Sequence, residues 1–207
     1  MLPKSVKAYT FSATQYVQEA VKNAEDYTKA KGYTFTSKKI GVPLPTNYSP
    51  EFDDSAELDA EEVSYYQSLI GILRWIVELG RIDINFEAST MSSHTALPRI
   101  GHLRKLFHIF GYLKHHSNAR LVFDPTYPSI NYERFPVNDW EQFYGSVKEE
   151  MPHDMPEPLG LEMIITVYVD ADLAGEKLRR RSRTGFIVFL NQGPIYWDSK
   201  RQGSIQT

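Results

Sequence analysis

The chain contains no cysteine among its 207 residues. This absence excludes a disulfide framework, a thiolate metal site, CxxC redox chemistry and a cysteine nucleophile. The chain also lacks the run of about 18 to 20 apolar residues that crosses a bilayer, and its start at Met1 has no apolar signal core. We therefore expect an intracellular protein with no signal peptide, no transmembrane segment and no membrane partner.

The composition is that of a folded protein, with 42% hydrophobic and 24% charged residues. Such a chain can bury a real core, in one large domain or two small ones. Its net charge of −3 hides an uneven distribution. Residues 51–62 carry seven acidic side chains and no basic one, whereas residues 99–120 carry five basic side chains and no acidic one. A mildly acidic chain can therefore still present a basic face.

The first 120 residues are predicted to be mainly helical. Apolar residues at helical spacing predict a helix that starts with a capping box at Ser12 and ends at Gly32. Prolines and acids over 33–58 predict an extended linker. Asp59 and Glu62 predict the start of a second helix, and a short helix is expected over 83–91. A fourth helix is expected to begin with Pro98 in its first turn and to run to about residue 116.

The residues after Gly160 show strand periodicity. Strands are expected over 163–169, 184–190 and 194–197, with a tight turn over 191–193, which gives an antiparallel meander. We place a domain boundary in the preceding irregular stretch, with three aromatic residues as plugs beneath it: Trp140, Phe143 and Tyr144. The fold class is therefore α+β, with a mainly helical region over 1–160 and a three-stranded sheet over 161–207.

The first of these strands leads to two carboxylates, Asp170 and Asp172. Carboxylates at the end of a buried strand commonly hold Mg²⁺, which prefers hard oxygen ligands on a rigid frame. An Asp-x-Asp pair is a weak signal alone, because an aspartate at this position can instead cap a turn. Either role is open for Asp172. The next connection is strongly cationic and, with the third strand, supplies these basic residues: Arg179, Arg180, Arg181, Arg183, Lys200 and Arg201.

Six segments, in order, resemble the copia-type (Ty1 class) LTR retrotransposon polyprotein. They are YQSLIGILRW at 66–75, GRIDI at 80–84, FGYLK at 110–114, VDADLAG at 169–175, RSRTG at 181–185 and PIYWDSKRQ at 194–202. The resemblance implies the thumb and connection region of a reverse transcriptase, followed by the start of a ribonuclease H domain. The intact element would copy RNA into DNA and cleave the RNA of RNA/DNA hybrids with Mg²⁺ or Mn²⁺, in a cytoplasmic virus-like particle or the nucleus.

The resemblance also assigns roles to residues. Asp170 matches the first catalytic carboxylate and metal ligand of the nuclease. Asp172 is a candidate metal ligand from the Asp-x-Asp pattern and is not assigned by the resemblance. Template-primer or hybrid phosphates would be contacted by the cations named above and by four cations of the fourth helix, namely Arg99, Arg104, Lys105 and Lys114. A solvated surface is the ordinary alternative for both basic groups.

Two departures from the family pattern bear on activity. The polymerase centre needs a Tyr-x-Asp-Asp hairpin and an earlier aspartate, which this sequence lacks. The nuclease needs about four carboxylates around two metal ions, and the glutamate expected second would lie just beyond Gln202, where the sequence ends at Thr207. We therefore expect an incomplete nuclease sheet, no tightly bound metal ion, no catalysis by this chain alone and self-association through the open sheet edge.

Three function classes stay open. The first is an inactive enzyme fragment of a copia-type reverse transcriptase and ribonuclease H. The second is a nucleic-acid-binding module without catalysis, which steeply salt-dependent affinity would indicate. The third is unrelated Asp-x-Asp chemistry, as in a phosphatase or a nucleotide-sugar transferase. A phosphatase would need Thr or Val two residues after Asp172, where Ala174 stands.

Overall fold

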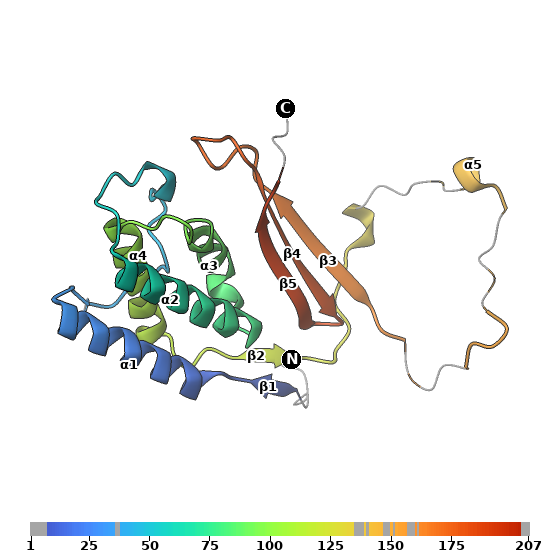
Figure 1. Ribbon diagram of the computed structural model, residues 1–207. Coiled ribbons are helices and arrows are strands. Elements are labelled where there is room, and N and C mark those ends of the chain that lie inside the picture. Colours follow the sequence, from blue (N-terminus) through green and yellow to red (C-terminus); the bar gives the residue numbers. More distant parts are fainter. Residues whose placement is uncertain are drawn as a thin grey trace.

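The computed structural model describes residues 8–35, 38–134, 139, 141–146, 150, 152–156, 160 and 162–203. Helices occupy most of the first half of the chain, and an antiparallel three-stranded sheet lies near its C-terminal end (Figure 1). The α+β fold class is therefore confirmed. The division into regions 1–160 and 161–207 stays a prediction.

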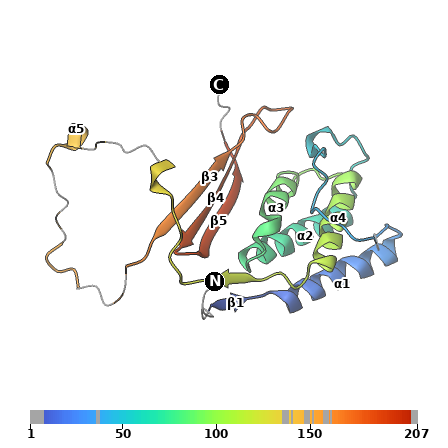
Figure 2. The same cartoon turned by 180° about the vertical axis from the view of Figure 1, so that it is seen from behind.

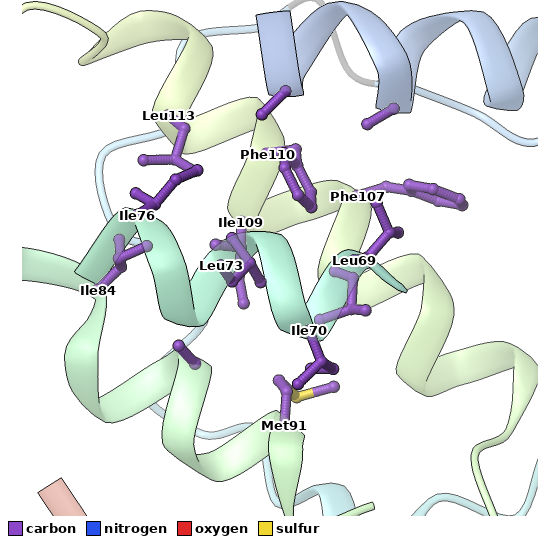
Figure 3. Packing of buried hydrophobic residues seen from close by; sticks show 14 of the residues in the cluster. Leu69, Ile70, Leu73, Ile76, Ile84, Met91, Phe107, Ile109, Phe110 and Leu113 are labelled. Atoms are coloured by element: carbon purple, nitrogen blue, oxygen red, sulfur yellow. The ribbon is translucent and has the colours of Figure 1, made fainter. Parts of the chain in front are cut away.

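Four helices enclose the core of the N-terminal half. They are α1 (Thr14–Lys31), α2 (Ala60–Glu78), α3 (Asn85–Ser92) and α4 (Ile100–His115), with a 3₁₀ turn, η2 (Ile82–Ile84), before α3. Figure 3 shows Leu69, Leu73 and Ile76 of α2 among side chains of α4, with Met91 of α3 beside Ile70. Apolar side chains spaced three and four residues apart meet on one face of each helix, so burying these faces together stabilises the bundle.

The helix ends follow local chemistry, with one correction. Gly32 ends α1 in the left-handed conformation at φ 72°, as predicted. Asp59 and Glu62 form the predicted capping box of α2. The predicted Ser12 cap is wrong, because Ala13 is the N-cap residue of α1 and no side chain caps it. Ser12 lies one residue before this N-cap, and its hydroxyl forms hydrogen bonds with Thr14.

A second correction concerns the start of α4. Arg99, not Pro98, stands at its N-cap, and the Arg99 N–H donates to Nδ1 of His102 over 3.1 Å. Pro98 lies before the helix, where its carbonyl accepts a hydrogen bond from the N–H of Leu58. This link to the incoming linker holds Pro98 outside the helix. The apolar face of α4 is buried in the core.

The linker over 33–58 holds no long regular element in its described part, only the 3₁₀ turn η1 (Pro50–Phe52). It is nevertheless packed onto the helices, because Ile40, Leu44 and Leu58 are buried. The N–H of Ile100 donates to the Ala56 carbonyl over 3.0 Å, which closes the end of the linker against α4.

The sheet has the order β3–β4–β5, and its neighbouring strands are antiparallel. The strands are β3 (Ile165–Ala171), β4 (Arg183–Leu190) and β5 (Gly193–Arg201). The meander is confirmed, but β3 runs on to include Asp170 and β5 runs on to Arg201. Among the described strands β3 pairs only with β4, so its other edge is open.

A second, two-stranded sheet was not predicted. β1 (Tyr9–Phe11) pairs with β2 (Leu121–Phe123), which lies beside β5. Hydrogen bonds extend this contact, since the N–H of Gln192 donates to the Asp124 carbonyl and the Asn191 amide donates to the Pro125 carbonyl. Both views of the ribbon show β2 running between the helices and the lower end of the sheet (Figure 2).

The stretch between β2 and β3 contains the 3₁₀ turn η3 (Tyr132–Arg134) and the short helix α5 (Glu141–Tyr144). The predicted plugging role is wrong for Phe143 and Tyr144, which are 78% and 67% exposed. Trp140 lies outside the described residues. In the part of the chain that the structure describes, no helix has the length and apolar character needed to cross a membrane.

Candidate functional site

Asp170 lies near the C-terminal end of β3, directly opposite Gly185 of β4, which in turn lies opposite Ser199 of β5. Residues opposite each other in a ladder share one face of the sheet. This face is turned towards the helices, because its members Trp197 and Arg183 bond Val77 of α2 and Ser89 of α3. The Asp170 side chain is exposed. Among the described residues its carboxylate has no hydrogen bond or ion pair and is free for a ligand.

Asp172 has a structural task. Its N–H donates to the Arg183 carbonyl over 3.1 Å, and its carboxylate accepts from the Arg183 N–H. These bonds close the loop over 173–182. Gly175 lies so close that any side chain there would collide with the Asp172 carboxylate. The structure thus shows the capping role, while metal binding by Asp172 stays a prediction.

The described residues hold no cluster of three or more His, Asp or Glu side chains arranged for a metal ion. Asp170 fits one ligand of a divalent ion, since it is an unpaired carboxylate on a rigid strand. A two-ion nuclease site needs several such oxygen donors to neutralise the ions and fix their separation. The described donor set therefore does not fit two metal ions.

The loop over 173–182, which we call the arginine loop, is organised around Glu176. The Glu176 carboxylate lies 3.1 Å from Arg201 of β5 and 4.0 Å from Arg179. Two further hydrogen bonds fix the loop, from the Glu176 N–H to the Arg181 carbonyl and from the Ala174 N–H to Ser182 Oγ. Arg179 and Arg180 project from it as exposed cations. The structure thus brings the predicted loop cations close to the strand that carries Asp170.

The four cations of α4 do not join this group. Arg99 donates to the Ser55 carbonyl and lies 3.7 Å from Glu57, so it holds the linker. Lys105 lies over the Tyr48 ring, 4.8 Å from its centroid. Lys114 pairs with Glu25 of α1 at 2.6 Å. Arg104 is exposed. Nucleic-acid contact by these four residues stays a prediction.

The last two predicted cations lie on β5. Arg201 faces Arg183 across the ladder, and Lys200 faces Thr184 on the opposite side of the sheet. Like charges directly opposite destabilise a strand pair unless another group compensates. Glu176 compensates Arg201 at 3.1 Å. Burial lowers the pKa of Arg183, opposed by Asp172, and the charge of Arg201 lowers it further.

A cavity of about 560 Å³ opens between α3 and the Asp170 face of the sheet. Its lining combines Asp170 with Asn85, Phe86, Tyr168, Arg183 and Trp197. We call this space the α3–sheet cavity. The contributions of Asn85 and Phe86 were missed from the sequence, because residues about 85 positions apart meet only after the sheet packs on α3.

A second cavity of about 370 Å³ lies between the linker, α3 and the arginine loop, and His94 and Glu87 contribute to its lining. Burial lowers the pKa of His94 to about 4, and the nearby His102 adds to this effect. Burial also raises the pKa of Glu87. The sequence analysis found neither group, since nothing in the spacing of the histidines marks His94.

Comparison with known proteins finds similarity to retrotransposon polyproteins. The chain is 23% identical over 176 residues to the Retrovirus-related Pol polyprotein from transposon RE1 of Arabidopsis thaliana, and 21% identical to that from transposon RE2. Each match covers 85% of this chain and 10% of the relative. The similarity supports a retrotransposon polyprotein. No family model matches the chain, and no solved structure does.

The chain thus spans about a tenth of the length of the curated relatives that it matches. The activities of the whole relatives do not follow for a segment of this size.

Proposed function

We propose that this chain is the part of a copia-type retrotransposon Pol polyprotein that runs from the reverse transcriptase thumb and connection region into ribonuclease H. In this proposal residues 1–160 form the helical thumb and connection region and residues 161–207 begin the nuclease. The observation that carries it is the β3–β4 hairpin, which presents the free Asp170 carboxylate and the arginine loop together. The similarity to the two Pol polyproteins supports the same reading.

The partner in this proposal is an RNA/DNA hybrid, held through its phosphates. Nucleic-acid backbones are recognised mainly through charge, because each neutralised phosphate releases condensed counterions. Arg179 and Arg180 are exposed and lie on a loop whose base is held by backbone hydrogen bonds. A fixed loop loses little conformational freedom on binding, so its cations bind phosphates at low entropic cost.

The proposal includes binding without cleavage by this chain alone. Asp170 would hold a divalent ion, Mg²⁺ or Mn²⁺ in the intact element, and the metal ion would supply activation of water. Among the described residues Asp170 can serve as one metal ligand, whereas Asp172 is engaged in closing the loop. A ribonuclease H reaction needs further carboxylates.

The test uses a fluorescently labelled RNA/DNA hybrid and the full chain at low salt, with Mn²⁺ present. The variant R179Q/R180N removes two loop charges, and asparagine suits the left-handed backbone of Arg180, whose φ is 52°. The control K22Q/K29Q removes two exposed charges from α1. We expect the loop variant to bind about tenfold more weakly and the control to bind like the unaltered chain.

Cleavage is read from the same samples on a denaturing gel. The proposal predicts intact RNA in every sample. The proposal is contradicted if the unaltered chain cleaves the RNA and the variant D170N does not. It is also contradicted if the loop variant and the α1 control weaken binding equally.

A further inference from the structure

The α3–sheet cavity has features that hybrid binding by the arginine loop does not use. At about 560 Å³ it falls in the size range of small-molecule sites, roughly 300–1,000 Å³. Apolar and aromatic residues provide most of its surface, as such sites usually show. The polar side chains that line it are those of Asn85, Arg183, Ser199 and the three carboxylates Asp170, Asp172 and Asp198.

Two aromatic rings border this cavity and remain accessible. Phe86 is 54% exposed and Tyr168 is 62% exposed. The Arg183 guanidinium lies 5.3 Å from the centroid of the Phe86 ring. Tyr168 packs edge-on with Phe189 at 5.7 Å and keeps much of its surface open. Exposed rings of this kind are platforms on which nucleobases stack.

The polar side chains of the cavity are poised for a ligand. The Asp170 carboxylate has no partner among the described residues and accepts hydrogen bonds, whereas the Asn85 amide both donates and accepts. Arg183 is held by a 2.6 Å hydrogen bond to Ser89 Oγ. No carboxylate of the described residues forms an ion pair with it. Asp172 and Glu176 favour its charged form from nearby without pairing with it, so this fixed, partly buried guanidinium keeps its donors available for a phosphate.

We propose that the α3–sheet cavity binds one unpaired nucleotide. The base stacks on Tyr168, the base edge bonds Asp170 and Asn85, and the phosphate pairs with Arg183. Because the Asp170 carboxylate accepts hydrogen bonds, a base with an exocyclic amino group, which donates two of them, binds better than uracil. The site does not use the arginine loop, so a nucleotide can occupy it whether or not that loop holds a hybrid. It shares Asp170 with the metal ion of the proposed function, so the nucleotide and the ion compete for this carboxylate.

The test is a calorimetric titration of the full chain with adenosine monophosphate, repeated with uridine monophosphate. Y168A should weaken adenosine monophosphate binding about tenfold, because a stacked base contributes on that scale. Y168F keeps the ring and should bind like the unaltered chain. The matched control is Y196A, since Tyr196 is 58% exposed and lies in the same sheet on the opposite face.

The phosphate contact has its own pair of variants. R183Q should weaken binding of adenosine monophosphate and leave adenosine binding unchanged. R120Q removes an exposed arginine that does not line the cavity and should alter neither. Thermal unfolding of each variant shows whether it is folded, and R183K, which keeps the charge, should bind more tightly than R183Q.

A further comparison identifies the source of the nucleotide. A hybrid with one unpaired terminal nucleotide is compared with a blunt hybrid and with free adenosine monophosphate. A Tyr168-dependent advantage of the overhang over the blunt end assigns the cavity to strand ends, whereas binding of the free nucleotide without that advantage assigns it to free nucleotides. The proposal is overturned if adenosine monophosphate shows no saturable binding, or if Y168A and Y196A weaken it equally.

Discussion

The indole N–H of Trp197 donates a 3.2 Å hydrogen bond to the backbone carbonyl of Val77, and this bond ties β5 of the sheet to the end of α2. The same tryptophan packs against the helical core and lines the α3–sheet cavity. The cavity therefore depends on a contact between residues 120 positions apart.

Replacing this tryptophan tests the tie between sheet and helices. W197F removes the hydrogen-bond donor and keeps an aromatic ring, so it should lower the free energy of unfolding by about 1–2 kcal/mol. The control is W75F, because Trp75 is 54% exposed and its replacement should change stability by less than about 0.5 kcal/mol. Urea unfolding of the full chain, followed by circular dichroism, measures both. Equal losses in the two variants would contradict the assigned contact.

The capping box of α2 gives a second prediction. The Asp59 carboxylate accepts from the Glu62 N–H over 2.8 Å, and D59A leaves that N–H without its partner. Loss of such a cap costs about 1 kcal/mol. D26A, which removes an exposed aspartate of α1 from a 3.8 Å pair with Lys29, should cost less than about 0.5 kcal/mol. Chemical denaturation compares the two, and a D26A loss as large as that of D59A would argue against the cap.

His94 should make stability depend on pH. Burial lowers its pKa from 6.5 to about 4, and the groups around it include His102, Arg201, Glu176 and Glu51. Between these two pKa values the unfolded chain binds more protons than the folded chain, so stability falls as the pH drops from 7 to 4. Solvent screening of a partly exposed ring limits the loss to about 1–2 kcal/mol.

The variant H94N should flatten this dependence, while H153N, which removes an exposed histidine, should leave it unchanged. Urea unfolding at pH 7 and at pH 5 gives the difference for each variant. A pH dependence that survives in H94N would assign the effect to other groups.

The sequence predicted the elements whose signals are local. Apolar spacing located α1, α2 and α4, since a helix repeats every 3.6 residues whatever it packs against. Gly32 and the Asp59 capping box gave two of their ends. The β meander followed from alternating residues and the turn at Asn191. The placement of Pro98 inside the fourth helix was wrong, because its carbonyl accepts a hydrogen bond from Leu58, a residue 40 positions away in the sequence.

The site was only partly predictable for the same reason. Asp170 follows from strand spacing and from the family resemblance, and the structure places it on the face that meets α3. The loop closure by Asp172 depends on Arg183, which only the β3–β4 register brings opposite. Phe143 and Tyr144 were assigned a buried role on hydrophobicity alone, and both are largely exposed.

The most direct test of the account is the salt dependence of hybrid binding. The logarithm of the affinity is plotted against the logarithm of the salt concentration for the unaltered chain, R179Q/R180N and K22Q/K29Q. Because each lost phosphate contact reduces the slope by about 0.9, R179Q/R180N should have a slope shallower by about 2, and K22Q/K29Q should match the unaltered chain. Parallel lines for all three proteins would contradict a phosphate-binding role for the arginine loop.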